Sequence, residues 1–135
     1  SGLSAERSAR LVTESSPEKT ILPAVGVVQS LIAIVNNAFD ASSTDQTVKL
    51  RAMYSGESTL FTVTDSGSGM DSATATRIAE PFFSTKPPGA GMGLGLFLVN
   101  LFSERVGASF DIVTEKSVGT TVTLSIPKLS LVRAA

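Results

Sequence analysis

A carboxylate at the end of an inward-facing strand pattern is the first residue of this sequence that could do chemistry. In "LFTVTD" the side chains of Phe61, Val63 and Asp65 share one face, because side chains alternate along a strand. An ionised carboxylate on a buried face is unfavourable unless it accepts hydrogen bonds. Asp65 therefore either caps the following turn or accepts from a donor on a ligand. Gly67 and Gly69 follow it, and glycine allows a ligand to approach the backbone closely.

A hydroxyl is expected on the buried face of the last strand pattern, "GTTVTLSIP". Val122, Leu124 and Ile126 point inward with period two, so Thr120 shares their face. Threonine is common in strands as a good β-former, so this position alone does not indicate a site. Its interest is that it faces the same side as Asp65.

A polar arc on a predicted helix over residues 23–41 is a third candidate. The core-facing stripe of this helix recurs at helical spacing and consists of Ala24, Val27, Val28, Leu31, Ile34, Val35 and Ala38. Away from the stripe, Ala33, Asn37 and Asp40 fall within an arc of roughly 60°. This arc is either a face in contact with solvent or a site where the amide oxygen of Asn37 is directed at a cation. Magnesium takes one or two protein oxygens together with phosphates and waters.

The glycine run "GAGMGLGL" precedes and opens another predicted helix. Free N–H groups at a helix start favour anions, so Gly91, Gly93 and Gly95 either bind phosphate or form a flexible turn. Lys86 lies upstream and could neutralise phosphate charge. Phe83, in the same segment, is either a core plug or part of a gate. No strand leads directly into these glycines, which argues against a dinucleotide-binding turn.

Composition limits the chemistry further. The chain has 135 residues, enough for one domain, and its net charge of −1 argues against a nucleic-acid-binding face. It has no cysteine, so neither a disulfide framework nor a cysteine-based metal site is possible. It also has no histidine, the usual general base, so any phosphohistidine must lie outside this chain.

The pattern predicts an α+β domain, a two-layer sandwich whose mixed, mainly antiparallel sheet is covered on one face by helices. Strands are predicted at 9–14, 47–54, 58–65, 108–115 and 119–127, a short helix within 66–80, and a helix at about 92–106 that is apolar nearly all round and so expected to be buried. Residues 1–8 are expected to be a frayed tag or linker remnant, 9–128 the domain and 129–135 a tail. The longest apolar stretch, 21–35, is interrupted and too short for a membrane span.

Five segments of the sequence belong together and follow one another in this order along the chain: "LIAIVNNAFDAS", "DSGSG", "EPFFSTK", "GMGLGL" and "GTTVTLSIP". They resemble the N, G1, F and G2 boxes and the closing strand of the catalytic, ATP-binding domain of two-component sensor histidine kinases, in the GHKL (Bergerat-fold) superfamily. The resemblance covers about residues 20–127. Within that family, the short lid and "FFSTK…GMGLGLF" look closest to redox-responsive kinases of the RegB/PrrB type.

The resemblance implies a site that holds ATP between helices and sheet. Asp65 would accept from the adenine amine with Thr120 assisting through water. Asn37 would hold Mg²⁺ on the phosphates, and Lys86 would approach the terminal phosphate, so these two are the implied catalytic residues. The other implied nucleotide-binding residues are Asp40, Gly67, Gly69, Met70, Phe83, Gly91, Gly93, Leu94, Gly95 and Leu96, with a lid at about 84–90.

The resemblance also implies a function. The domain would transfer the γ-phosphate of ATP to a histidine on a separate dimerisation and phosphoacceptor domain of the same parent kinase. A response regulator would be the downstream partner. The isolated chain would be monomeric and show little turnover, and it would be a cytoplasmic domain of a bacterial sensor, whose parent could be anchored in the inner membrane.

One departure from the family pattern keeps other functions open. Relatives carry a second polar residue where this chain has Ala33, and gyrase-like and mismatch-repair-like ATPases use a glutamate there to activate water. Independent ATP hydrolysis is therefore not expected. The alternatives are a clamp-type ATPase, a nucleotide-binding module without transfer activity, and a serine kinase of the anti-sigma type, against which "EPFFSTK" counts.

Overall fold

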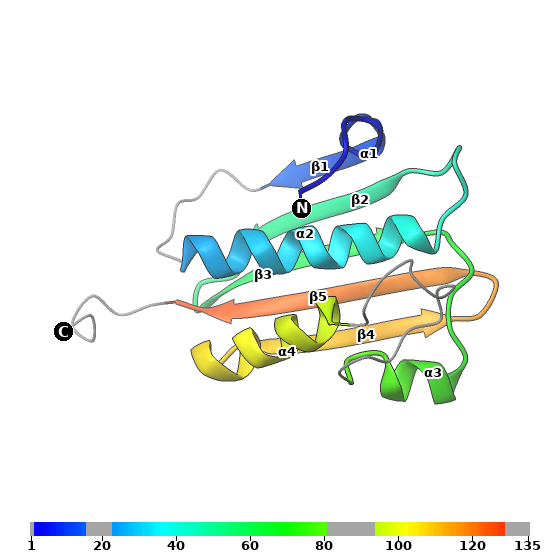
Figure 1. The fold of residues 1–135 in the computed structure, drawn as a ribbon. Helices are drawn as coiled ribbons and strands as arrows, with labels where there is room; N and C mark the ends of the chain where they lie inside the picture. Colours follow the sequence, from blue (N-terminus) through cyan, green and yellow to red (C-terminus); the bar gives the residue numbers. More distant parts are fainter. Residues whose placement is uncertain (1, 16–22, 81–93, 129–135) are drawn as a thin grey trace.

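The structure, a computed structural model, describes residues 2–15, 23–80 and 94–128 (Figure 1). Its elements, in chain order, are α1 (Ala5–Arg10), β1 (Leu11–Ser15), α2 (Ala24–Asp40), β2 (Val48–Tyr54), β3 (Ser58–Asp65), α3 (Ser72–Arg77), α4 (Gly95–Val106), β4 (Ser109–Glu115) and β5 (Gly119–Pro127). The predicted strands and the two long helices are therefore present, with ends shifted by at most a few residues.

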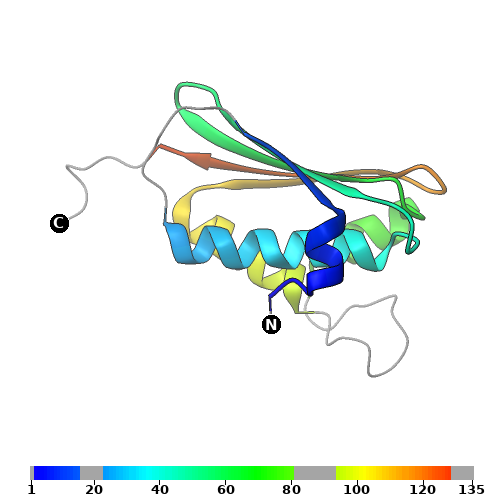
Figure 2. The ribbon, with the colours of Figure 1, turned by 90° about the horizontal axis from the view of Figure 1, so that it is seen from above.

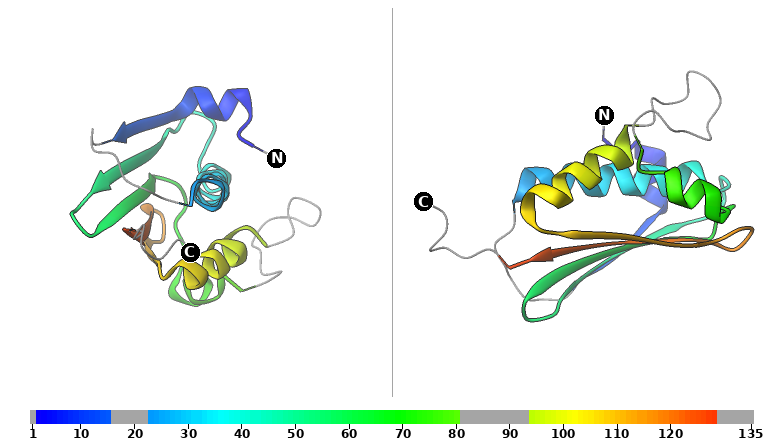
Figure 3. Two further views of the ribbon diagram at one scale, coloured as in Figure 1. Left: turned by 90° about the vertical axis from the view of Figure 1, so that its left-hand side faces the viewer. Right: turned by 90° about the horizontal axis from the view of Figure 1, so that it is seen from below.

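The strands form one five-stranded sheet in the order β1-β2-β3-β5-β4. Strand β1 pairs with β2 in parallel, while β2–β3, β3–β5 and β4–β5 are antiparallel. Helices α2, α3 and α4 all lie on the same face of the sheet (Figures 2 and 3). The predicted α+β class, with helices on one face of a mixed and mainly antiparallel sheet, is confirmed.

The hydrophobic core fills the space between the helices and the sheet. Its buried side chains are Val27, Ile34, Val35, Ala38 and Phe39 from α2, Leu96 and Val99 from α4, and Val48, Val63, Val122, Leu124 and Ile126 from the strands. Two predictions are wrong. Ala24 and Val28 of the predicted α2 stripe are both exposed, Val28 to 54%, so they lie outside the core. Helix α4 is not buried all round, because Leu98 is 56% exposed. A helix in the outer layer of a two-layer sandwich buries only the side that meets the sheet and its neighbour.

Residues 5–8, expected to be frayed, belong to helix α1. The Ser4 hydroxyl caps this helix by accepting from the Arg7 backbone N–H at 3.2 Å. Arg10 forms an ion pair with Glu6 at 2.6 Å, and its guanidinium lies 4.9 Å from the centre of the Phe39 ring. A helix of six residues is too short to be stable alone, so these contacts stabilise it.

Helices α2 and α4 pack closely where α2 carries a glycine. A Cβ atom on Gly26 would lie 2.2 Å from Cε1 of Phe102. The glycine therefore permits a helix separation that a larger side chain would prevent. None of the helices formed by the described residues is long and apolar enough to cross a membrane.

Candidate functional site

Asp65 ends β3 on the helix-facing side of the sheet. It is 6% exposed and pairs with Thr120 of β5, which is 8% exposed. Its Oδ1 accepts a hydrogen bond from the Gly67 N–H at 2.9 Å. Burial raises the pKa of the Asp65 carboxyl, and this outweighs the backbone N–H groups of Gly67 and Thr120, which lower it. The predicted inward orientation of both residues is confirmed.

Two threonine hydroxyls link the start of β5 to the loop after β3. Oγ1 of Thr114 on β4 lies 2.8 Å from Oγ1 of Thr120, and it accepts from the Met70 N–H at 2.9 Å. Thr114 and Thr120 are directly paired in the β4–β5 register. Sequence reasoning missed Thr114, although the predicted hairpin places it opposite Thr120.

The glycines of the loop after β3 are required by contacts within the protein. A Cβ atom on Gly67 would lie 2.2 Å from the carbonyl oxygen of Ala41. Gly69 has a φ of +65°, and a Cβ atom there would lie 2.0 Å from the carbonyl oxygen of Glu115. The loop is thus held between the end of α2 and the β4–β5 turn, and this accounts for both glycines without reference to a ligand.

The same loop is bonded to the C-terminal end of α2. The Ser68 N–H donates to the Ala41 carbonyl at 3.0 Å, and Nε2 of Gln46 donates to the Ser66 carbonyl at 3.0 Å. Asn37 lies one turn before Ala41, so the polar arc of α2 and the Asp65 loop are brought together.

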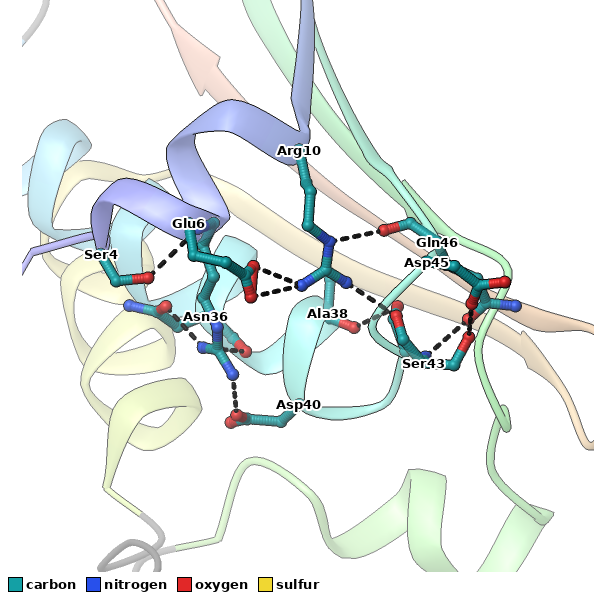
Figure 4. A network of polar contacts seen from close by, with 11 residues as sticks. Ser4, Glu6, Arg10, Asn36, Ala38, Asp40, Ser43, Asp45 and Gln46 are labelled. Atoms are coloured by element: carbon teal, nitrogen blue, oxygen red, sulfur yellow. Dashed lines mark hydrogen bonds and ion pairs between the residues drawn. The ribbon is translucent and has the colours of Figure 1, made fainter.

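The two polar residues of the α2 arc differ in their contacts. Within the described ranges, the partly exposed side chain of Asn37 makes no hydrogen bond. The Asp40 carboxylate, in contrast, is paired with Arg7 of α1 at 2.7 Å (Figure 4). Among the described residues, the amide oxygen of Asn37 is therefore available to a cation.

The start of α4 faces the same arc. A Cβ atom on Gly95 would lie 3.7 Å from Cβ of Ala33. Leu94 is the N-cap of α4 and makes no side-chain capping hydrogen bond, so the N-cap side chain does not satisfy the first backbone N–H groups of the helix. Leu96 is 6% exposed and belongs to the hydrophobic core.

Four of the predicted site residues, Phe83, Lys86, Gly91 and Gly93, lie outside the described residues, as does the expected lid at 84–90. Their roles stay predictions. Among the described residues, no group of three or more His, Cys, Asp or Glu side chains gathers as a metal site.

A cavity of about 670 Å³ lies between α2 and α4. Its described lining includes Ser30, Ala33 and Asn36 of α2 and Gly95, Leu98 and Phe102 of α4. It therefore reaches the α2–α4 contact at Ala33 and Gly95. Asp65 and Thr120 are not among its described lining residues.

Comparison with known proteins agrees with this arrangement. Residues 24–130 match the family described as histidine kinase-, DNA gyrase B-, and HSP90-like ATPase. The sensor histidine kinase ZraS of Escherichia coli (strain K12) is 31% identical over 101 residues, covering 75% of this chain and 21% of ZraS. A probable C4-dicarboxylate sensor kinase of Halalkalibacterium halodurans is 30% identical over 131 residues, covering 91% of this chain and 24% of the relative.

Solved structures show the same fold. The mycobacterial sensor histidine kinase MprB superposes with a TM-score of 0.76 at 21% identity, covering 93% of this chain and 88% of that one. The catalytic domain of histidine kinase ThkA gives 0.75 at 24% identity, with coverage of 87% and 79%. The narrower likeness to RegB/PrrB-type kinases stays a prediction.

Proposed function

Because the chain belongs to the histidine kinase-, DNA gyrase B- and HSP90-like ATPase family, we propose that it binds Mg²⁺-ATP and donates the γ-phosphate to a histidine on a separate domain. The observation that carries this proposal is the buried carboxylate of Asp65. Burial disfavours the charged form of this aspartate, and a hydrogen-bond donor from a bound base would compensate for it.

Asp65 and Thr120 would recognise adenine. The exocyclic amine of adenine donates to a carboxylate, whereas guanine presents a carbonyl oxygen at the equivalent position and would be repelled. Thr120 offers a hydroxyl beside Asp65, and Thr114 orients that hydroxyl at 2.8 Å. A pair of this kind favours ATP over GTP, because the wrong base leaves buried polar groups unpaired.

Asn37 and the start of α4 would bind the phosphate end. The Asn37 amide makes no hydrogen bond among the described residues, so its oxygen is available to Mg²⁺. The first turn of α4, which has no side-chain cap from its N-cap residue Leu94, would offer backbone N–H groups to anionic oxygens. Lys86, Gly91 and Gly93 are proposed to complete the phosphate contacts. The metal, when bound, neutralises charge on the phosphates.

Transfer to histidine requires little further chemistry from this domain. The chain itself has no histidine, so the acceptor must lie elsewhere. An imidazole is a nucleophile in its own right, and phosphoryl transfer depends mainly on positioning and charge stabilisation. Ala33, which cannot act as a base, is therefore compatible with transfer. The chain spans 21% to 24% of the length of the two sensor kinases described above, so we propose that the phosphoacceptor domain and a response regulator act with it.

A transfer experiment tests the proposal. The chain is mixed with the histidine-bearing helical domain of its parent kinase and γ-labelled ATP, and the label on the acceptor is followed. We expect Mg²⁺-dependent labelling that is lost in acid, and a strong loss of labelling with Asn37→Ala. Asn100→Ala, on the exposed side of α4, is the matched control and should transfer normally. Acid-stable label would indicate a serine acceptor, and nucleotide binding without any label would indicate a module without transfer activity.

A further inference from the structure

The cavity of about 670 Å³ between α2 and α4 arises where α2 presents small side chains to its neighbour. The two helices lie side by side on the same face of the sheet (Figure 3). Gly26 of α2 lies opposite Phe102, and Ala33 lies opposite Gly95. Ser30 stands between Gly26 and Ala33 at helical spacing, and all three line the cavity. Small side chains leave the space between the helices unfilled, and its volume is typical of small-molecule sites.

Ser30 brings a buried hydroxyl to the wall of this cavity. Its residue is 4% exposed, and its Oγ makes no hydrogen bond with any residue that the structure describes. Ser103 of α4 is also buried, but its Oγ donates to the Val99 carbonyl at 2.9 Å. A buried hydroxyl without a hydrogen bond is unfavourable. Ser30 therefore offers both a donor and an acceptor to a molecule that fills the cavity.

The rest of the described lining restricts the chemistry of such a molecule. Leu98, Val99 and Phe102 of α4 supply an apolar wall that includes an aromatic ring. Gln29 and Asn36 of α2 add neutral amides, and no described lining residue carries a charge. A charged ligand would lose its hydration there without meeting an opposite charge, which is unfavourable. The lining thus favours an uncharged ligand with an apolar body.

We propose that this cavity is a binding site for an uncharged aromatic small molecule that carries one hydrogen-bonding group. Its ring packs against Phe102 and Leu98, and its polar group pairs with the Ser30 hydroxyl. This pairing satisfies the buried hydroxyl and selects ligands with a polar group at that position. The inference does not rest on the proposed function. The cavity reaches Ala33 and Gly95, so a bound molecule would lie beside the proposed phosphate contacts and would touch both helices.

Phenol is the probe that tests the inference, and toluene is the matched probe with a ring but no hydroxyl. Each is titrated into the full chain, and binding is followed by the shifts of the backbone amide NMR signals. We expect saturable shifts at Ser30, Leu98 and Phe102. Ser30→Ala should weaken phenol binding about fivefold and change toluene binding by less than about twofold. Val28→Ala, at an exposed position of α2 outside the described lining, is the control and should bind both probes normally.

A second variant fills the cavity and leaves the Ser30 hydroxyl in place. Ala33→Leu adds apolar volume beside Gly95 and should abolish binding of both probes, while its amide spectrum reports whether the fold is kept. Binding that persists in a folded Ala33→Leu chain would place the probes elsewhere and would overturn the inference. So would the absence of saturable phenol binding to the unmodified chain, unchanged phenol binding by Ser30→Ala, or an equal loss of both probes in that variant.

The same titration in the presence of Mg²⁺ and a non-hydrolysable ATP analogue separates this inference from the proposed function. We expect the phenol affinity to stay within about twofold of its value without nucleotide. Displacement of phenol by the analogue would show that the cavity is the phosphate end of the nucleotide site, and the inference would fall. If the analogue does not bind at all, the proposed function fails, and the phenol result still decides the inference.

Discussion

Asp65 and Thr120 face each other at one end of the β3–β5 ladder, and both are buried. The rest of that sheet face is filled mainly by apolar side chains, among them Val63, Val122 and Leu124. A carboxylate there adds nothing to hydrophobic packing. It accepts from the Gly67 N–H at 2.9 Å, and under the proposed function it would also accept from a bound adenine, which gives testable consequences for stability and binding.

The first prediction is that Asp65→Asn stabilises the free protein near neutral pH. The pKa of Asp65 is raised from its ordinary value of 3.8, so the folded chain binds a proton more readily than the unfolded chain. The associated stability is present below that ordinary value and is lost as pH rises through the raised value. Asparagine stays neutral at all pH values, and its side-chain oxygen can still accept from Gly67.

Thermal unfolding followed from pH 3 to pH 8 measures this effect. The stability gain of Asp65→Asn should be largest at neutral pH and should vanish in acid. Asp111→Asn, at an exposed position of β4, is the control for loss of a charge. If the stability gain of Asp65→Asn were the same at every pH, ionisation of Asp65 would not be what destabilises the unmodified protein, and the prediction would be contradicted.

The second prediction concerns Thr114→Val. The change leaves the Met70 N–H and the Thr120 hydroxyl without this partner. Both hydrogen bonds are partly buried, and a typical intramolecular hydrogen bond contributes about 1 kcal/mol, so the free energy of unfolding should fall by about 1–2 kcal/mol. Denaturant unfolding measures it. Thr123→Val, on the other face of β5, should change stability much less, and equal losses in both variants would contradict a specific role for Thr114.

The third prediction is that Gly95→Ala weakens nucleotide binding without lowering the stability of the fold. Among the residues that the structure describes, an added Cβ would meet Cβ of Ala33, at an ordinary contact distance of 3.7 Å. Alanine is a better helix former than glycine by up to about 1 kcal/mol, so Gly95→Ala should preserve or raise stability. If backbone near Gly95 contacts phosphates, the same variant should bind nucleotide several-fold more weakly. Unfolding and binding measured on one preparation would show this split, and unchanged affinity would contradict it.

The fourth prediction concerns the spacing of α2 and α4. Gly26→Ala would place a Cβ atom 2.2 Å from the Phe102 ring, so it should destabilise the fold by about 1–3 kcal/mol despite a better helix propensity. In a Phe102→Leu background the clash is removed, and Gly26→Ala should become neutral or favourable. Equilibrium unfolding of the four chains in this cycle measures the coupling. Additive effects would contradict direct contact.

Much of the fold could be predicted from periodicity. The apolar stripe of α2 and the alternation of apolar residues in β3 and β5 indicate which side of each element is buried. The inward orientation of Asp65 and Thr120 could therefore be predicted from this alternation. Val28 and Leu98 could not be placed correctly in this way, because an apolar residue at the margin of a stripe is buried only if a neighbouring element covers it.

Helix α1 and its contacts could not be predicted from local pattern. Its stability comes from Arg7 and Arg10 reaching residues of α2 and the segment after it, about 30 positions away. The pairing of Asp40 with Arg7 depends on that same tertiary contact. The position of Thr114 opposite Thr120 could have been predicted from the hairpin. Pairing Glu115 with Gly119 at the turn places Thr114 opposite Thr120.

Base selectivity tests the central claim most directly. Calorimetric titration would compare non-hydrolysable ATP and GTP analogues, with Mg²⁺, on the unmodified chain and on Asp65→Asn. We expect the unmodified chain to prefer the ATP analogue by at least about tenfold, and Asp65→Asn to lose that preference while staying folded. Equal binding of the ATP analogue by both proteins would contradict the assignment of Asp65 as the adenine acceptor.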